Sequence, residues 1–387
     1  MIKEKYIYPD QKPNTLLLAI EAPYNRTKSI ESYFDEFKNL ARTNQVATDH
    51  IIYLKLREID PTYFLTKGKL KDIKDYCDEH KIEEVILSEP LTVQQERNLD
   101  DYLRCRIFDR TRLILEIFEK SAHSAEGKIQ VELARLQHKK SRLAGKGVNM
   151  SQQMGAIGGR GPGETAKERE TRHIETIVLR LRGELERIDR ARETQRKQRI
   201  QKRIPHICLI GYTNAGKSTI LNTLTRSNVL AEDKLFATLD TTTRELYVNS
   251  KKVGLISDTV GFIQLLPHQL IKAFKSTLSE LKYADLLLHV VDVSDLNWES
   301  QIEVVHSILE ELEVDKQMLY VFNKADKTEI TDFLKSALDK YEPHVVINAL
   351  TKDGIVPLTE YLDQWNTERN PIPEINNYMS DSDDELL

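Results

Sequence analysis

The string GYTNAGKS at residues 211–218 constrains the fold of this 387-residue chain more than any other feature. It has two glycines with four residues between them, followed by Lys and Ser, and it directly follows the apolar run at 206–210, which predicts a buried strand. A strand that enters a glycine-rich turn and then a helix can cradle phosphates, because the backbone curls around the anion and the helix amides face it. The string therefore predicts an α/β layer built around a phosphate site.

Within this string each residue type has a chemical role. Gly211 and Gly216 let the backbone approach the phosphates, and Lys217 is expected to reach the β- and γ-phosphates. The hydroxyl of Ser218 is expected to ligate Mg²⁺.

A second string, DTVGF at 258–262, ends another apolar run. This places Asp258 at the carboxyl end of a strand, where it can hold Mg²⁺ through water, and Gly261 where its amide can meet a γ-phosphate. The string is the expected sensor of hydrolysis.

The third string, NKAD at 323–326, follows the apolar run 318–322 and predicts recognition of the base. The carboxylate of Asp326 can accept two hydrogen bonds from guanine N1 and N2, and Asn323 can face O6 or N7. Adenine presents a mismatched edge and would leave a carboxylate unpaired, so GTP is favoured over ATP. After the apolar residues 345–347, the amide of Ala349 is expected to meet guanine O6.

The nucleotide site is thus predicted in full. The residues expected to contact the nucleotide are Gly211, Asn214, Ala215, Gly216, Lys217, Ser218, Thr219, Asp258, Gly261, Asn323, Lys324, Asp326, Asn348, Ala349 and Leu350. Ser218, Asp258 (through water) and Thr238 are the expected Mg²⁺ ligands. Thr241 or Thr242 of the hydroxyl-rich loop 236–244 remain alternatives to Thr238, and any of the three can instead be a turn or strand-entry residue.

Phe262 follows the sensor glycine at a position where many small GTPases carry a Gln that orients the attacking water. A phenyl ring cannot do this, so no general base is assigned and hydrolysis by the isolated protein is expected to be slow. A partner, a potassium ion or substrate-assisted positioning must then supply the missing organisation. Asn214 is the residue type that potassium-activated GTPases use to hold K⁺ beside the phosphates, although a turn residue is an equally good explanation.

Residues 124–203 differ in charge from the rest of the chain. From Glu126 to Arg203 there are 20 Lys and Arg against 10 Asp and Glu, whereas the whole chain has a net charge of −5. Apolar stripes at 129–143 and 174–188 predict two long helices packed as a hairpin, whose seam closes within one chain and favours a monomer. The alternative explanation is that the basic side chains merely face solvent on an amphipathic helical pair.

Between these two helices the segment 155–165 has five glycines and one proline, which exclude helix and predict a loop. We expect this tip to approach RNA through residues 158–161. The expected RNA-binding residues are Gly158, Gly159, Arg160 and Gly161.

Four apolar runs alternating with helical patterns predict a small, mostly parallel α/β domain at residues 1–123. The expected order is this domain, the basic hairpin at 124–203, the nucleotide domain at 204–370 and an acidic tail at 371–387. Three dispersed cysteines indicate reduced thiols. With no signal sequence and no long apolar run, a cytoplasmic protein without a membrane partner is expected.

The strings GGRGPGET, GYTNAGKS, FATLDTTTR, DTVGF and NKAD together resemble those of the HflX family of translational GTPases over nearly the whole chain. The resemblance implies an α/β domain, a helical hairpin and a Ras-like P-loop GTPase domain. It also implies binding of GTP, GDP and Mg²⁺, splitting of stalled or stressed ribosomes through the large subunit and its RNA, and hydrolysis stimulated by the ribosome.

This chain departs from the usual family pattern at Ala166, Lys167 and Thr241. A divergent paralogue associated with antibiotic resistance therefore stays open. Two further functions are compatible with the same residues: a GTPase that assembles the large subunit, and a GTP-dependent scaffold that recruits a protein.

Overall fold

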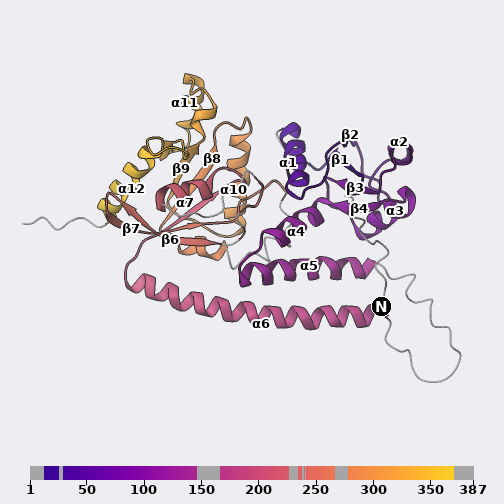
Figure 1. Ribbon diagram of the computed structural model, residues 1–387, viewed down its shortest axis with the longest axis horizontal. Helices are drawn as coiled ribbons and strands as arrows, with labels where there is room; N and C mark the ends of the chain where they lie inside the picture. Colours follow the sequence, from indigo (N-terminus) through magenta and orange to yellow (C-terminus); the bar gives the residue numbers. More distant parts are fainter. Residues whose placement is uncertain are drawn as a thin grey trace, which may run out of the picture.

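The computed structural model describes residues 13–25, 29–145, 166–225, 234–237, 239, 241–265 and 278–369. Two α/β bodies lie side by side above a pair of long helices (Figure 1). The predicted fold class is confirmed. The exact domain boundaries given above stay predictions.

The first body is a parallel sheet of four strands in the order β2-β1-β3-β4. Its elements are β1 Thr15–Glu21, α1 Ile30–Thr43, β2 His50–Lys55, α2 Lys67–Glu79, β3 Glu84–Leu87, α3 Val93–Leu103 and β4 Arg106–Asp109. Side chains of β1 alternate between two cores, because successive strand residues point to opposite faces. Leu17 and Ala19 pack with α1, whereas Leu16 and Leu18 pack with α2.

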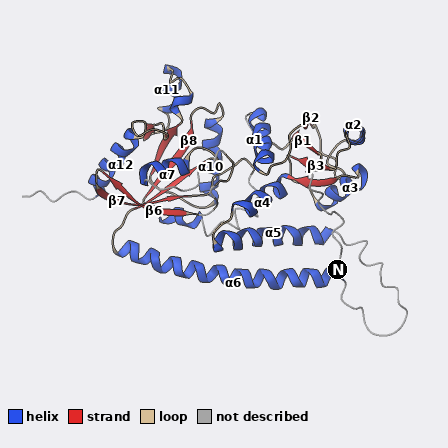
Figure 2. Ribbon diagram, in the orientation of Figure 1, coloured by secondary structure: helices blue, strands red, loops and turns tan. Residues whose placement is uncertain are grey.

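Below this sheet the chain forms α4 Arg110–Ser121, α5 Ala125–Gly145 and α6 Ala166–Gln201. The predicted hairpin is present: the apolar stripes of α5 and α6 meet in one core that contains Leu133, Leu136, Ile174 and Leu181. Figure 2 shows α6 extending along the underside of both bodies. The predicted tip residues 158–161 lie outside the described residues.

The second body is a sheet of six strands in the order β10-β9-β8-β5-β7-β6, in which only the β6–β7 pair is antiparallel. Its first elements are β5 His206–Gly211, α7 Lys217–Thr225, β6 Thr242–Val248, β7 Lys251–Asp258, η1 Ser279–Tyr283 and β8 Leu286–Asp292. Then follow α10 Trp298–Glu311, β9 Met318–Asn323, η2 Ala325–Lys327, α11 Asp332–Leu338, β10 His344–Val346 and α12 Val356–Arg369.

One hydrophobic core crosses from the first body to the second. It includes Phe37 of α1 and Phe118 of α4 together with Phe236 and Phe262 of the second body. The rings of Phe118 and Phe236 lie edge to face with centroids 4.6 Å apart, a favourable aromatic geometry. The two bodies are therefore packed together next to the nucleotide motifs.

Cys77, Cys105 and Cys208 are free and buried. Among the described residues, none of the helices combines the length and the apolar character that crossing a bilayer requires.

Candidate functional site

The phosphate loop joins the carboxyl end of β5 to the start of α7, as the sequence predicts. Gly216 has φ +100, and a Cβ at this position would collide with the side-chain amide of Asn323. Only glycine fits such a left-handed conformation in such close contact. Asn214 also has positive φ, at 62, which Asn tolerates better than most residues. The turn role considered for Asn214 is therefore present, and K⁺ binding stays a prediction.

Lys217 points from the first turn of α7 back over the loop. Its Nζ donates to the backbone carbonyls of Gly211 at 3.1 Å and Tyr212 at 2.8 Å. Burial lowers the pKa of Lys217 to about 8, although the charge of Asp258 opposes this shift. The site thus holds a buried cation next to neutral acceptors, an arrangement that suits a phosphate.

Two of the expected Mg²⁺ ligands, Ser218 and Asp258, lie together. Ser218 Oγ donates to Asp258 Oδ2 at 2.5 Å, and Asp258 is fully buried at the end of β7. A hydroxyl and a carboxylate are hard oxygen donors, the type that Mg²⁺ prefers when phosphates and water complete its shell. These residues fit the metal. Thr238, the first choice for a third ligand, lies outside the described residues.

The alternatives to Thr238 differ in their surroundings. Thr242 is the first residue of β6 and pairs with Asp258 in the β6–β7 register. The hydroxyl of Thr241 is buried and has no hydrogen-bond partner within the described residues. The strand-entry explanation therefore fits Thr242, whereas Thr241 remains a candidate ligand.

The segment after Asp258 lies against the phosphate loop. A Cβ on Gly261 would lie 2.8 Å from Cα and Cγ2 of Thr213 and 3.0 Å from Nζ of Lys217, so only glycine allows this approach. The amide of Phe262 donates to the Gly211 carbonyl at 3.2 Å, and the amide of Thr213 donates to the Phe262 carbonyl at 2.8 Å. The ring of Phe262 is only 2% exposed. It is a core residue, which agrees with assigning it no role in activating water.

The base-recognition loop follows β9. Asn323 is buried, and its Nδ2 donates to the Ala215 carbonyl at 2.9 Å while its Oδ1 accepts from the Ala349 amide at 3.1 Å. In this structure the side chain of Asn323 thus joins three nucleotide loops. The contacts predicted from Asn323 and Ala349 to the base stay predictions, because these two groups bind each other here.

The neighbouring residues of this loop differ in exposure. Lys324 donates to Asp292 Oδ2 at 2.6 Å and to the Asn214 carbonyl at 2.9 Å. Asp326 is exposed, so its carboxylate is accessible to a ligand. The amide of Leu350 donates to the Asn348 side chain at 3.0 Å, and the side chain of Leu350 is exposed.

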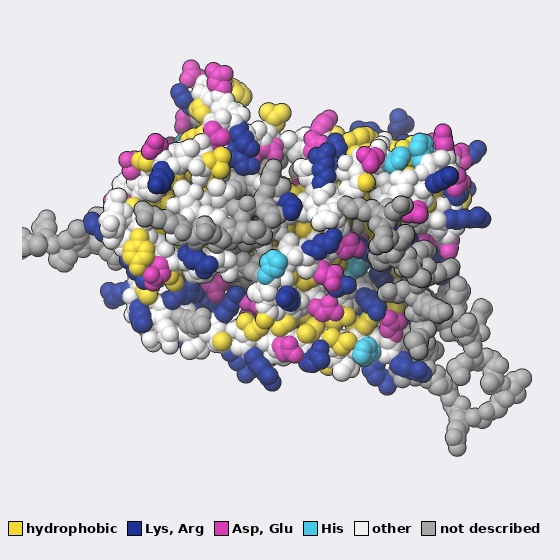
Figure 3. Space-filling view, in the orientation of Figure 1, with side chains coloured by type: hydrophobic (Ala, Val, Ile, Leu, Met, Phe, Trp, Pro, Cys, Tyr) yellow, Lys and Arg dark blue, Asp and Glu magenta, His cyan; other side chains and the backbone are white. Residues whose placement is uncertain are grey.

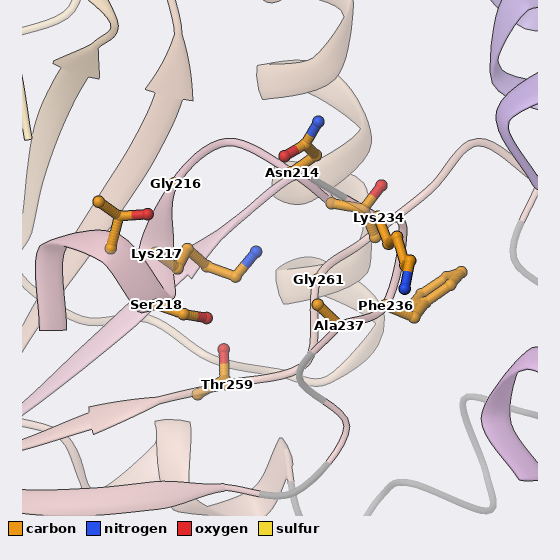
Figure 4. Close-up of a pocket in the computed structure, with 11 residues that line it drawn as sticks. Asn214, Gly216, Lys217, Ser218, Lys234, Phe236, Ala237, Thr259 and Gly261 are labelled. Carbon is orange, nitrogen blue, oxygen red and sulfur yellow. The ribbon is translucent and has the colours of Figure 1, made fainter. Parts of the chain in front are cut away.

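These groups form a pocket (Figure 4), in which Lys217, Ser218 and Gly261 lie around a common space. The pocket is lined by Thr213, Asn214, Gly216, Lys217, Ser218, Thr219, Lys234, Phe236, Ala237, Thr259 and Gly261. Thr213, Thr259 and the segment from Lys234 to Ala237 were not predicted as ligand contacts. Thr213 occupies a variable position of the phosphate-loop pattern, so the pattern carries no signal for it.

Sequence reasoning also missed a buried polar network beside the pocket. Tyr212 of the phosphate loop donates its hydroxyl hydrogen to Glu36 of α1, and accepts from the amide of Gln264 at 2.8 Å. Arg110 of α4 forms an ion pair with Glu36 and donates to the Gln264 carbonyl at 3.0 Å. Burial raises the pKa of Glu36, although Arg110 opposes this shift. The network ties the first body directly to the phosphate loop.

Known proteins resemble the chain over most of its length. Three family models match: GTP-binding GTPase N-terminal at 31–119, GTP-binding GTPase Middle Region at 121–199 and 50S ribosome-binding GTPase at 206–324. A GTPase HflX of Caldanaerobacter subterraneus is 43% identical over 83% of this chain and 74% of its own. The GTPase HflX of Escherichia coli K12 is 39% identical over 88% and 80%.

A solved structure, that of SsGBP in complex with GDP, aligns with 92% of this chain and 99% of its own, with a TM-score of 0.50 and 26% identity. The motifs, the phosphate pocket and the extent of these similarities agree on one reaction, the hydrolysis of GTP to GDP and phosphate. The chain belongs to the HflX family of GTPases.

Proposed function

We propose that this GTPase binds the large ribosomal subunit through the hairpin and the first α/β body and splits stalled or stressed ribosomes. Family membership supports binding to the ribosome, since the model that matches residues 206–324 describes a 50S ribosome-binding GTPase. The observation that carries the proposal is the buried set of contacts that joins the nucleotide domain to the hairpin and to the first body.

The hairpin offers a surface suited to RNA. Exposed basic side chains occur along α6 at Arg169, Arg172, Arg180, Arg182, Arg187, Arg190 and Lys197. In Figure 3 Lys and Arg side chains gather along the lower edge of the molecule, over α6. Cationic side chains on one face contact phosphates without reading sequence, as binding to structured RNA requires.

A buried ionic cluster connects the hairpin to the nucleotide domain. Glu280 of η1 accepts from Arg196 and Arg199 of α6, each at 3.0 Å. Although burial opposes the shift, hydrogen bonds from Arg199 and Arg196 lower the pKa of Glu280, so its carboxylate stays charged. The guanidinium of Arg196 also lies 3.8 Å from the ring centroid of Tyr283. Movement of η1 would therefore be transmitted to the end of α6.

The Tyr212, Glu36, Arg110 and Gln264 network makes the corresponding connection to the first body. Gln264 and Glu280 lie on opposite sides of residues 266–277 in sequence, and Gln264 contacts the first body whereas Glu280 contacts the hairpin. GTP with Mg²⁺, held by Ser218 and Asp258, would order the loops and fix one arrangement of these parts. Because a ligand shifts only the states it binds differently, GDP must support ribosome binding less well than GTP.

Hydrolysis by the isolated protein is proposed to be slow, since the buried Phe262 ring offers no group to orient water. The ribosome, or K⁺ near Asn214, would supply the missing organisation. Turnover measured with and without purified ribosomes, in sodium and in potassium buffers, tests both. Brisk turnover by the isolated protein, unchanged by ribosomes, would contradict the proposal.

The hairpin role is tested by the double variant Arg160→Ala, Gly161→Ala. We expect it to abolish stimulation of turnover by ribosomes and to leave GDP affinity unchanged, because the tip is separate in sequence from the nucleotide motifs. Lys251→Ala, which removes an exposed cation of β7, is the matched control and should keep full stimulation. Equal stimulation of the double variant and the parent would discard the hairpin role.

Sedimentation separates splitting from assembly and from protein recruitment. Mature ribosomes incubated with the protein and a non-hydrolysable GTP analogue should yield free subunits if it splits them, whereas an assembly factor would bind immature large subunits and leave mature ribosomes intact. A protein-recruiting scaffold would cosediment in a manner insensitive to ribonuclease.

A further inference from the structure

Thr213 has the one buried hydroxyl among the described lining residues of the phosphate pocket for which no hydrogen-bond partner is found in the described part of the chain. The residue is 6% exposed. A buried hydroxyl without a partner destabilises a protein, since it has lost its hydrogen bonds to water. Valine has the same shape and would avoid this cost. A hydroxyl at this position is therefore explained if it binds a ligand.

The surroundings of Thr213 identify the part of the nucleotide that it would meet. Its methyl carbon Cγ2 and Lys217 Nζ approach the same point beside Gly261, at 2.8 and 3.0 Å from the position of a Cβ on that glycine. The Lys217 ammonium and the Gly261 amide are the groups expected at the γ-phosphate. The amides that cradle the β-phosphate come later in the loop, from Ala215 to Ser218. The Thr213 side chain is therefore on the γ-phosphate side of the pocket, and rotation about χ1 brings its hydroxyl to the place where the methyl group lies.

The backbone of Thr213 is fixed in this position. Its amide donates to the Phe262 carbonyl at 2.8 Å, and the preceding Tyr212 is held by Glu36 and Gln264. Because its own amide and the preceding residue are both held, the Thr213 side chain starts from a fixed backbone, which lowers the entropic cost of one further hydrogen bond.

We propose that the Thr213 hydroxyl donates a hydrogen bond to an oxygen of the γ-phosphate and that it thereby helps the protein distinguish GTP from GDP. GDP has no γ-phosphate and leaves the hydroxyl unsatisfied. Thr213 is in this respect a specificity residue for the triphosphate, in addition to Lys217 and Gly261.

The experiment compares Thr213→Val, which removes only the hydroxyl, with Thr213→Ser, which keeps it and removes the methyl group. Dissociation constants for GDP and for a non-hydrolysable GTP analogue are measured by calorimetry with Mg²⁺. A hydrogen bond to a charged oxygen is worth about a tenfold change in affinity or more. The valine variant should lose about tenfold for the analogue and less than about twofold for GDP, and the serine variant should lose neither.

Thermal unfolding without nucleotide supplies an independent readout. The valine variant should be at least as stable as the parent, because it no longer buries an unsatisfied hydroxyl, and the analogue should stabilise it less than it stabilises the parent. Unchanged affinity for the analogue, or an equal loss for both nucleotides, would overturn the proposal. If valine distorts the loop and weakens GDP binding, the two dissociation constants are measured for Thr213→Ala instead. A loss for the analogue that is no larger than the loss for GDP would then overturn the proposal.

Discussion

The phosphate pocket and the interface between the two bodies both bury charge, but they balance it differently. At the interface Arg110, 1% exposed, is paired with Glu36, 7% exposed, and its guanidinium lies 4.9 Å from the Tyr33 ring centroid. In the pocket Lys217 contacts carbonyl oxygens, and the Thr213 hydroxyl lacks a partner in the described structure. The interface pairs its cation directly with a carboxylate, whereas in the pocket the hydrogen-bond partners of Lys217 are neutral carbonyls and Asp258 acts on it without a hydrogen bond, which suits an anion from outside.

Tyr212 belongs to both regions. Its carbonyl accepts from Lys217 in the pocket and its hydroxyl donates to Glu36 at the interface. A change in the loop on nucleotide binding is thus transmitted to a buried ion pair, where small displacements alter the energy strongly because the surroundings have low polarity. Variants in the pocket should alter mainly affinity, and variants in the interface mainly stability.

The largest effect on affinity is expected for Asp326→Asn. An amide cannot accept from both N1 and N2 of guanine, so GDP affinity should fall at least about 100-fold. Xanthine carries an oxygen at position 2 and should bind the variant better than the parent. Because Asp326 is exposed, unfolding of the nucleotide-free protein should hardly change.

Calorimetric titration with GDP and with xanthosine diphosphate, together with a urea unfolding curve, measures these quantities. A large fall in the unfolding free energy of Asp326→Asn, measured without nucleotide, would contradict the distinction between the phosphate pocket and the interface.

Arg110→Met should have the opposite pattern. It leaves the Glu36 carboxyl buried without its cationic partner, which costs about 3–5 kcal/mol of unfolding free energy for a buried pair. Adding Glu36→Gln should recover part of the loss, since the remaining charge is removed. Urea unfolding measures both variants.

Arg112→Met is the matched control on the same helix. Arg112 pairs with Glu116 at 3.4 Å, but its side chain is 45% exposed, so the loss should be at most about 1 kcal/mol. Similar losses of unfolding free energy for Arg110→Met and Arg112→Met would mean that the buried Arg110–Glu36 pair contributes no more to stability than an exposed pair.

The contrast between the regions also explains what the sequence can predict. Lys217, Ser218, Asp258 and Gly261 were predicted because their spacing is fixed by the phosphate chemistry within short strings, and the structure brings them together. The strands around them were predicted because apolar runs precede the strings. The helical hairpin was predicted from its apolar stripes, which meet as expected.

The interface was not predicted. Tyr212 and Glu36 are 176 residues apart in the chain, and Arg110 and Gln264 are 154 apart. Glu36 has the helical setting of any surface glutamate, and only the packing of two domains buries it. Strand β8 was also missed, because its apolar residues fit a buried helix as well as a buried strand.

The smallest expected effect is a pH dependence of nucleotide binding. Burial lowers the pKa of Lys217 from 10.5 to about 8. Between these values the unfolded chain binds more protons than the folded one. The loss of unfolding free energy caused by burying this cation is therefore complete below pH 8, and it diminishes as the pH rises through 8. Phosphates stabilise the charged form, so binding of GDP takes up a proton and weakens above pH 8.

From pH 7.0 to 8.5 the affinity for GDP should therefore fall about fourfold. Calorimetry in two buffers of different ionisation enthalpy should show proton uptake on binding. Lys217→Arg keeps its charge throughout this range, so its affinity should be flat apart from the titration of the nucleotide itself, which is common to both proteins. Identical pH profiles for the variant and the parent would mean that the buried lysine is charged before the nucleotide arrives, and that the pocket, like the interface, already holds its balancing charge.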